Sequence, residues 1–309
     1  MLLDETARGI FVISVTPFTD DGSLDLESTE KLVEFYLEKG VSGLTVLGMM
    51  GEAPKLTHDE AQAFVAHVLK CVGGRVPVVV GVSAPGFAAM KELSQQVMDL
   101  GAAGVMVAPT SNLRTDHQLY SYFSNVVDAI GADVPFVLQD FPLATGVQIA
   151  PDVIARIVRD MPSCVMLKHE DWPGLSKIET LRSAESKTGL RRISILGGNG
   201  GLFLPEELQR GTDGAMTGFG YPEMMVDVQH AREGGDHDRA QDLFDAYLPL
   251  ARYEQQPGLG LAIRKEILAR RGAINSSFAR RPAPKLSAGD MADIDFLQRR
   301  QERRLKELN

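Results

Sequence analysis

The sequence alternates short apolar runs with amphipathic stretches along most of its length. The runs are nearly continuous in apolar residues, as expected for parallel strands that are covered by helices on both faces. Alternation of this kind favours an α/β fold with a parallel sheet. The expected strands span residues 10–16, 44–48, 78–82, 105–108, 135–138, 164–168, 193–196 and 214–217.

Helical patterns fill the segments between the expected strands. The clearest helix start is Thr57, which is followed by Glu60 at the spacing of a capping box. The segment 25–39 places its apolar residues near one face, which is typical of a helix that packs on a sheet. Further helices are expected over residues 88–100, 117–130, 151–159 and 175–186.

About eight βα units within about 230 residues predict a (β/α)8 TIM barrel, an α/β fold. The alternative is a doubly wound open sheet, which usually carries a glycine turn after its first strand, where this chain has Thr16-Pro17-Phe18. In the last third of the chain, helical patterns follow one another without strands. We therefore expect a barrel over residues 1–225 and a C-terminal helical extension over residues 226–309, packed on the barrel or on a neighbouring subunit.

Composition excludes several classes of partner. The formal net charge of −9 disfavours nucleic acid and anionic membranes. The only two cysteines, Cys71 and Cys164, lie in apolar surroundings and indicate buried free thiols in a reducing compartment. The start of the chain does not resemble a signal peptide, and no apolar run reaches the roughly 20 residues of a spanning helix. We expect a cytoplasmic protein.

Lys168 ends the apolar run that begins at Cys164, and Glu170 follows two positions later. In a (β/α)8 barrel the active site lies at the carboxyl ends of the strands. Burial at that place disfavours an ammonium and makes a neutral amine accessible, which is the nucleophile of Schiff-base chemistry. The structural alternative is a solvated lysine that merely ends a strand.

The ends of the expected strands carry an ordered set of motifs. Together they resemble the dihydrodipicolinate synthase/N-acetylneuraminate lyase superfamily of Schiff-base TIM barrels, over almost the whole chain. This resemblance implies that Lys168 is the Schiff-base lysine. The motifs are Thr16-Pro17-Phe18, the turn Gly48-Met49-Met50-Gly51-Glu52 with Leu56-Thr57, Pro142, Thr145-Gly146 and Lys168.

The chain departs from dihydrodipicolinate synthases at the positions that move protons and bind substrate. Those enzymes carry a threonine pair where this chain has Met49 and Met50, and a tyrosine where it has Gln139. In a second tyrosine segment this chain offers Ser111, and the arginine that holds a substrate carboxylate corresponds to Ala144. The usual hydroxyl relay is therefore replaced, and dihydrodipicolinate synthesis itself is not expected.

A closer likeness is to the L-2-keto-3-deoxyarabonate dehydratase branch of the superfamily. It is carried by glutamine-aspartate-x-proline at 139–142, lysine-x-glutamate at 168–170, the segment 214–218 and Leu248-Pro249-Leu250. The likeness implies a Schiff-base lyase that dehydrates a 2-keto-3-deoxy sugar acid. Two alternatives stay open: an aldolase that releases pyruvate, and an inactive barrel that binds a 2-oxo acid as a regulatory protein.

The resemblance also assigns roles to the expected catalytic residues. Lys168 condenses with the C2 carbonyl of the substrate. Strand alternation places Lys168 and Glu170 on one face and His169 on the other. Glu170 is expected either to shuttle a proton or to form an ion pair with Lys168. Gln139 is expected to hydrogen-bond a substrate hydroxyl.

The remaining candidates lie at other strand ends. The backbone N–H groups of Met49 and Met50 are expected to bind the substrate carboxylate, and their thioethers either form an apolar wall or pack in the core. The glycine run 197–201 is expected to contact sugar hydroxyls, with a phosphate cradle as the alternative. We expect no cofactor and no metal, a small 2-oxo acid as substrate, and a dimer or tetramer. The candidate substrate-binding residues are Gly48, Met49, Met50, Gly51, Ser111, Gly198, Asn199, Thr217 and Gly218.

Overall fold

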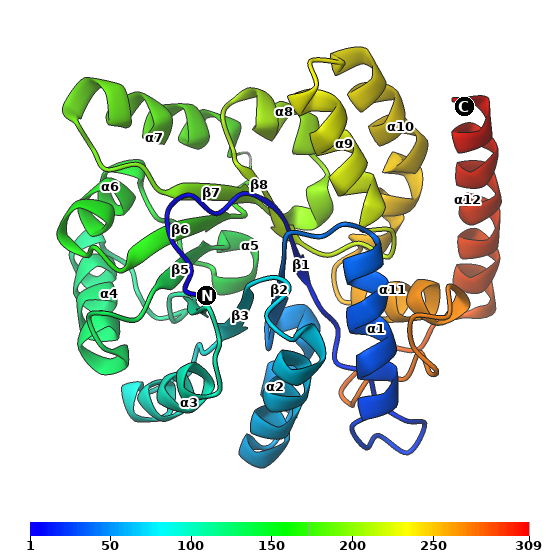
Figure 1. Ribbon diagram of the computed structural model, residues 1–309, viewed down its shortest axis with the longest axis horizontal. Coiled ribbons are helices and arrows are strands. Elements are labelled where there is room, and N and C mark those ends of the chain that lie inside the picture. Colours follow the sequence, from blue (N-terminus) through cyan, green and yellow to red (C-terminus); the bar gives the residue numbers. More distant parts are fainter. Residues whose placement is uncertain (173, 309) are drawn as a thin grey trace.

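The computed structural model describes residues 1–172 and 174–308. Within them, eight parallel strands close into a barrel in chain order (Figure 1). The pairing of β8 with β1 closes the ring, so the predicted TIM barrel is confirmed and an open doubly wound sheet is excluded. The strands are β1 (Gly9–Ile13), β2 (Gly43–Val46), β3 (Val78–Gly81), β4 (Gly104–Val107), β5 (Phe136–Asp140), β6 (Cys164–His169), β7 (Ser194–Gly197) and β8 (Gly214–Thr217).

Helices fill the crossovers between the strands. The capping box of α2 is present: Thr57 Oγ1 accepts from Glu60 N at 3.2 Å, and Glu60 Oε2 accepts from Thr57 N at 2.9 Å. Asp25 caps α1 in a similar way by accepting from Ser28 N. The helices are α1 (Leu26–Glu38), α2 (His58–Val72), α3 (Phe87–Asp99), α4 (Asp116–Ile130), α5 (Pro142–Thr145), α6 (Pro151–Asp160), α7 (Leu175–Thr188), α8 (Leu204–Gln209), α9 (Glu223–Glu233), α10 (His237–Glu254), α11 (Gly260–Arg270) and α12 (Ala288–Glu307), with short 3₁₀ turns η1 (Met49–Gly51), η2 (Ala53–Lys55) and η3 (Asn199–Gly201).

Four strands end earlier than the apolar pattern predicts: β3 and β4 by one residue each, and β1 and β2 by more. β1 ends at Ile13 although the apolar run continues to Thr16. β2 ends at Val46 because the next residue, Leu47, adopts a left-handed backbone (φ 54°) that a strand cannot accommodate. Apolar character alone therefore overestimates the length of these strands, since buried residues also continue into the turns that follow them.

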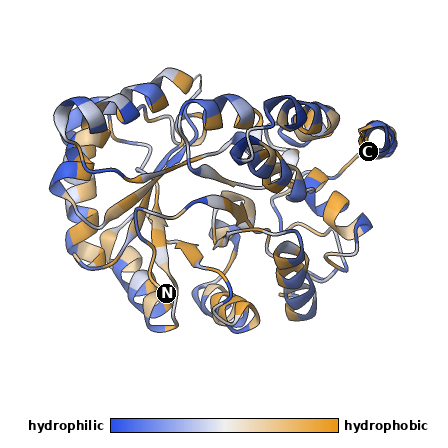
Figure 2. Cartoon of the chain, turned by 45° about the horizontal axis from the view of Figure 1, so that its top comes forward, coloured by the Kyte–Doolittle hydropathy of each residue, from blue (hydrophilic) through white to orange (hydrophobic). Residues whose placement is uncertain are grey.

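Side chains alternate between the inside of the barrel and the layer beneath the helices. Met166 belongs to the interior cluster, whereas its neighbour Leu167 belongs to the larger cluster between strands and helices. Figure 2 shows the apolar strands in orange, enclosed by helices whose outer faces are blue. Leu3 packs in the interior cluster, and its N–H donates to the Ala103 carbonyl at 2.8 Å.

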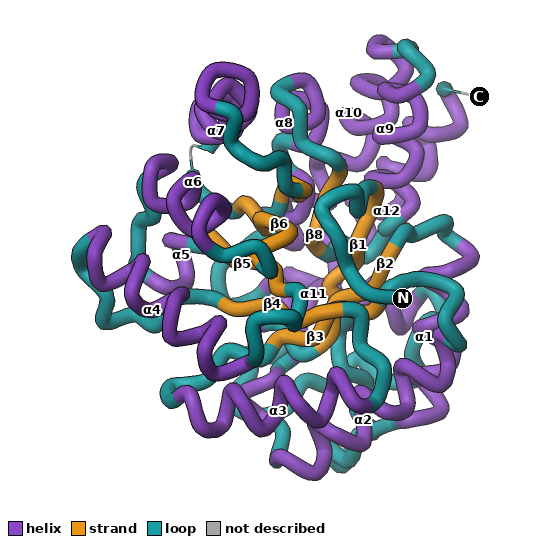
Figure 3. Tube along the Cα trace, turned by 60° about the vertical axis from the view of Figure 1, so that its left-hand side comes forward, coloured by secondary structure: helices purple, strands orange, loops and turns teal. Residues whose placement is uncertain are grey.

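The C-terminal extension packs directly on the barrel. α9 spans the boundary expected at residue 225, α10 packs against α9, and α12 packs against α10 (Figure 3). One buried cluster joins Ile10 of β1 and Ala215 of β8 to Phe244, Ile263 and Ile294 of the last three helices. Barrel and extension therefore share a hydrophobic core.

Three further findings concern the expectations from composition. None of the described helices is both long and apolar enough to cross a membrane. Cys164 is a buried free thiol, but Cys71 is only partly buried, so the expectation of two buried thiols is half correct. The described residues contain no group of three or more His, Cys, Asp or Glu side chains that is arranged to hold a metal ion.

Candidate active site

β5 and β6 carry the candidate catalytic side chains within paired strands. β5 continues to Asp140 and β6 to His169, one or two residues beyond the expected ends. Gln139 and Lys168 are partners in the register of these two strands. Side chains on a hydrogen-bonded strand are held more rigidly than side chains on a loop. The predicted strands ended too early, at 138 and 168, because the residues that complete both strands are polar.

Lys168 and Glu170 point into the barrel, on the same side as Met166. The Nζ atom of Lys168 lies 2.8 Å from Oε2 of Glu170, and both side chains are 6% exposed. Lys168 is therefore not a solvated strand end. The ion pair with Glu170, one of the two arrangements that the sequence left open, is present.

Gln139 contacts the same carboxylate. Its Nε2 donates to Glu170 Oε2 at 2.8 Å, so an ammonium and an amide converge on one oxygen atom. On the other side, a Cβ placed on Gly198 would lie 2.1 Å from Glu170 Cγ and 2.9 Å from Oε1. The glycine at position 198 is required by this packing, and the Glu170 carboxylate has little freedom to move.

The glycine run after β7 is fixed against its neighbours by two hydrogen bonds. Asn199 Nδ2 donates to the Glu170 carbonyl at 3.2 Å, from a left-handed backbone (φ 48°). Thr217 Oγ1 accepts from Gly200 N at 2.8 Å. Asn199 thus contacts the backbone of Glu170, and Thr217 contacts the glycine run beside it. Both side chains already have protein partners. Their expected contacts with substrate stay predictions.

Gly218 lies against a buried ion pair of the C-terminal helices. Its carbonyl accepts from Arg264 Nη2 at 2.5 Å, and a Cβ at this position would lie 2.3 Å from Arg264 Nη1. Arg264 Nε in turn donates to Glu254 Oε1 at 2.6 Å. The carboxyl end of β8 is thus held by α10 and α11.

The turn after β2 forms η1. Gly51 N donates to the Gly48 carbonyl at 3.0 Å, and the Gly51 carbonyl accepts from Thr16 Oγ1 at 2.6 Å. The Met49 side chain is 46% exposed, whereas Met50 packs against the interior cluster. Packing in the core is therefore observed for Met50 but excluded for Met49.

Ser111 lies apart from the other candidates. It is exposed on the loop between β4 and α4, where its carbonyl accepts from Arg114 Nη1 at 2.6 Å. In the described part of the chain its hydroxyl forms no hydrogen bond with Lys168, Glu170 or Gln139. Contact of Ser111 with substrate stays a prediction.

Glu207 is a buried carboxyl that the sequence pattern does not reveal. Acidic residues in the first turn of a helix are usually exposed, and Glu207 occupies that position in α8. Its carboxyl packs against Gly197, where a Cβ would lie 2.1 Å from Oε2, and Oε2 has no hydrogen-bond partner among the described residues. Burial, together with the nearby charges of Glu206 and Glu170, raises the pKa of Glu207 to about 8.

A second buried polar group lies on the outer side of β5 and β6. Asp140 Oδ2 accepts from Lys177 Nζ at 2.8 Å and lies 3.6 Å from His169 Nδ1. His169 Nε2 lies 3.0 Å from the Gly174 carbonyl. His169 therefore points away from Lys168, as strand alternation predicts. The role of Lys177 was missed, because nothing near it in the sequence indicates a buried partner.

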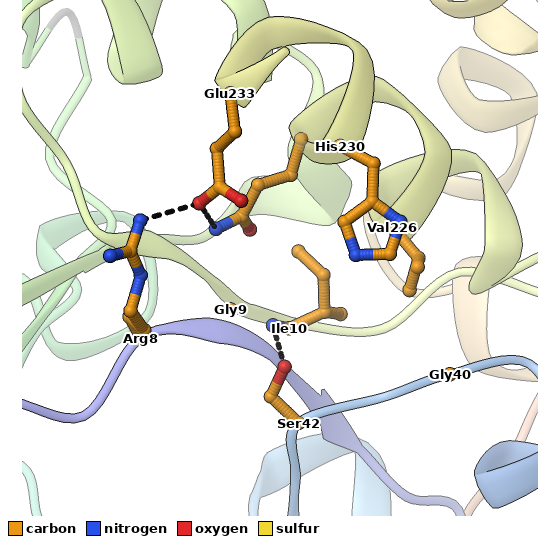
Figure 4. Close-up of a pocket in the computed structure, with 9 residues that line it drawn as sticks. Arg8, Gly9, Ile10, Gly40, Ser42, Val226, His230 and Glu233 are labelled. Carbon is orange, nitrogen blue, oxygen red and sulfur yellow. Dashed lines mark hydrogen bonds and ion pairs between the residues drawn. The ribbon is translucent and has the colours of Figure 1, made fainter.

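A cavity of about 110 Å³ lies at the opposite end of the barrel, where β1 and β2 begin (Figure 4). Glu233 Oε1 accepts there from Arg8 at 2.6 Å and from Gln229 at 3.0 Å, and Ser42 Oγ accepts from Ile10 N at 3.2 Å. These groups pair with one another. In TIM barrels this amino end serves stability, so the cavity does not compete with Lys168 as an active site.

Comparison with known proteins identifies the family of this chain. The profile described as the dihydrodipicolinate synthetase family matches residues 6–294. The L-2-keto-3-deoxyarabonate dehydratase of Azospirillum brasilense is 31% identical over 306 residues, covering 95% of this chain and 94% of that protein.

Solved structures show the same likeness. A dihydrodipicolinate synthase from Rhodopseudomonas palustris is 52% identical, with a TM-score of 0.95 and coverage of 97% of this chain and 99% of that one. A prophage protein of the dihydrodipicolinic acid synthase family from E. coli K12, solved in complex with pyruvate, is 25% identical with a TM-score of 0.86, covering 96% of this chain and 98% of that one. The chain belongs to the dihydrodipicolinate synthetase family.

Proposed function

We propose that this protein is a Schiff-base lyase that dehydrates a 2-keto-3-deoxy sugar acid. The observation that carries the proposal is the buried pair of Lys168 and Glu170, with Nζ and Oε2 2.8 Å apart. In a site shielded from water, the amine is a nucleophile and the carboxylate beside it is a proton acceptor within hydrogen-bond distance.

In the proposed reaction, Lys168 passes a proton to Glu170 and attacks the C2 carbonyl of the substrate as a neutral amine. Glu170 returns the proton to the C2 oxygen and then carries a second proton from the adduct nitrogen to the resulting hydroxyl, which leaves as water and gives an iminium ion. The Glu170 carboxylate then removes a proton from C3, and the electron pair forms an enamine. Glu170 gives that proton to the C4 hydroxyl, which leaves as water. Hydrolysis of the remaining iminium releases the product and restores Lys168.

Gln139 orients this carboxylate through its hydrogen bond to Oε2. An amide cannot relay protons as a phenol does, so the proton transfers are assigned to Glu170 alone. The N–H groups of Met49 and Met50 receive the substrate carboxylate, which compensates for the uncharged Ala144 on α5. The end of the substrate that carries the hydroxyls faces Gly198 and Asn199.

The relatives favour this reaction without requiring it. The Azospirillum brasilense protein, which matches nearly the whole chain, is named as a dehydratase. The Rhodopseudomonas palustris protein is named as a synthase, although a threonine pair, two tyrosines and an arginine that the resemblance leads us to expect in synthases are replaced in this chain. We therefore assign dehydration on the residues of the site.

Borohydride trapping tests the proposal. The protein is incubated with pyruvate or with a 2-keto-3-deoxy sugar acid, reduced, and examined by mass spectrometry. We expect an adduct on the peptide that contains Lys168 and none in Lys168→Met. Product analysis should show loss of water from the sugar acid. Release of pyruvate would identify an aldolase instead, and absence of any adduct with either compound would refute Schiff-base catalysis.

A further inference from the structure

Glu52 ends the turn that follows β2, and its carboxylate is buried between two lysines. Its backbone is left-handed (φ 57°, ψ 27°), a conformation that is sterically disfavoured for a non-glycine residue. The residue is 1% exposed. Its Oε1 lies 2.6 Å from Lys265 Nζ, and its Oε2 lies 2.9 Å from Lys55 Nζ. These two ion pairs hold a conformation that the backbone alone disfavours.

Lys265 reaches Glu52 from α11, and its side chain has no exposed surface. Its Nζ also donates to the Phe278 carbonyl at 2.8 Å and lies 4.5 Å from the centre of the Phe18 ring. Burial lowers the pKa of Lys265 to about 8, and the Glu52 carboxylate opposes that shift. Removing either partner of such a buried pair leaves an uncompensated charge.

The segment 271–287, which we call the C-terminal strap, connects α11 to α12 across the same region. The Phe278 carbonyl of the strap accepts from Lys265, and its Arg280 carbonyl accepts from Lys55 Nζ at 2.7 Å. Arg280 Nη1 donates in return to the Lys55 carbonyl at 3.0 Å. Both lysines that hold the turn are therefore themselves held by the strap.

The position of Glu52 sets the position of the turn. Its N–H donates to the Met49 carbonyl at 3.1 Å, and on the other side the Gly51 carbonyl accepts from Thr16 Oγ1 at 2.6 Å. The peptide groups of Met49 and Met50 lie between these two attachments. A shift of Glu52 would rotate those peptide groups and redirect their N–H bonds.

We propose that Glu52 and Lys265 are positioning residues that hold the turn in the form that receives the substrate carboxylate, so that the C-terminal strap is part of the substrate site. This proposal rests on the function proposed above, which gives that carboxylate to Met49 and Met50. Neither Glu52 nor Lys265 forms a hydrogen bond or ion pair with Lys168. Their loss should therefore weaken binding and leave the Schiff-base step itself intact.

The test separates binding from chemistry in the full-length protein. Wild type, Glu52→Gln, Lys265→Met and Lys265→Arg are incubated with graded concentrations of pyruvate and reduced with borohydride, and the adduct on Lys168 is quantified by mass spectrometry. In Glu52→Gln and Lys265→Met, the pyruvate concentration for half-maximal trapping should rise about tenfold or more, because a small misplacement of a binding group has an effect of this size. The trapped fraction at saturating pyruvate should stay at the wild-type value, and Lys265→Arg should restore part of the affinity.

Arg182→Met is the matched control. Arg182 pairs with Asp213 at the amino end of the barrel, with N and O 2.6 Å apart, so its loss should lower Tm without changing the half-maximal concentration. An unchanged half-maximal concentration in folded Glu52→Gln and Lys265→Met would overturn the proposal. Loss of folded protein in both variants, measured by circular dichroism, would also overturn it, because a purely structural pair gives that result. A wild type that forms no adduct with any 2-oxo acid would instead overturn the proposed function.

Discussion

Two buried lysines lie on opposite sides of the same pair of strands and differ in the number of their partners. Lys168 points into the barrel and has one polar partner among the described residues, the Glu170 carboxylate. Lys177 reaches the outer side of β5 and β6 from α7, and its ammonium has three partners. These are Asp140 Oδ2 at 2.8 Å, Asp171 Oδ2 at 2.7 Å and the Ile149 carbonyl at 2.8 Å.

The difference shows which buried lysine is suited to chemistry. An ammonium has three N–H donors, so Lys177 is fully hydrogen-bonded and is stabilised as a cation by two carboxylates. Lys168 has two donors that face no protein acceptor in the described residues, and its single carboxylate is shared with Gln139. Burial alone therefore does not make a lysine nucleophilic. In the proposed reaction, this incomplete pairing inside the barrel is what suits Lys168, and not Lys177, to attack a carbonyl carbon.

The largest effect on activity is expected when the Glu170 carboxylate is neutralised. Glu170→Gln keeps the shape of the side chain but removes the proton acceptor 2.8 Å from Lys168. We expect kcat to fall about 10³-fold, within the usual range for loss of a general acid–base group. Steady-state kinetics with a 2-keto-3-deoxy sugar acid provide the measurement. A kcat within tenfold of wild type would show that another group moves the protons.

Removing the fully paired lysine should affect stability and spare the chemistry. Lys177→Met leaves the carboxylates of Asp140 and Asp171 without their cation, which should lower the free energy of unfolding by about 3–5 kcal/mol. Urea denaturation measures this loss. The folded fraction should still form the borohydride adduct on Lys168.

Lys168→Met is the matched control for that experiment. It also removes a buried cation, but Gln139 still donates to the carboxylate that is left, so the loss of stability should be smaller. If Lys177→Met were folded but formed no adduct, the division between a structural and a catalytic lysine would be wrong.

The pH dependence of thermal stability tests the burial of the Glu207 carboxyl. Burial raises its pKa to about 8 in the folded protein, above the value of 4.5 for a free carboxyl. The native state therefore binds this proton more tightly than the unfolded chain does. The resulting stability is fully present below about pH 4.5 and is lost as pH rises towards 8. Tm should fall by several degrees across this window, and Glu207→Gln should flatten the fall. Identical pH profiles of Tm for the two proteins would contradict the assignment.

The smallest effect is expected at Gln139. Gln139→Leu removes the hydrogen bond to Glu170 Oε2 and leaves the carboxylate with Lys168 as its partner. Loss of one hydrogen bond to a charged group should lower kcat about tenfold, which corresponds to roughly 1.4 kcal/mol. KM should rise as well if the amide also contacts a substrate hydroxyl. Unchanged kinetics would show that the ion pair is oriented without help from Gln139.

Sequence reasoning predicted those parts of the site that depend on local periodicity. The period of two along β6 places Lys168 and Glu170 on one face, and the alternation of strands and helices fixes the end of the barrel where they lie. The strand ends were less accurate, because turns such as Leu47 are set by backbone conformation and not by apolar character.

Other parts could not be predicted because they depend on contacts between distant segments. Glu207 has the local pattern of an exposed residue at a helix start, and only the glycine at 197 shows that the carboxyl can pack inward. Ser111 has a suitable hydroxyl, but its exposure on the loop between β4 and α4 is not indicated by the sequence. Exposure of this kind is set by the path of the loop after β4, which no periodicity describes.

The ion pair between Glu52 and Lys265 also has a consequence for the synthesis of the protein. The two residues are 213 positions apart, and the carbonyl of Phe278 that completes the group lies further along the chain. Lys168 and Glu170 therefore emerge from the ribosome long before the cation that holds the turn at 48–52. If this pair positions the turn as proposed, a chain that stops before Lys265 lacks the finished site for the substrate carboxylate, and affinity for substrate develops late in translation.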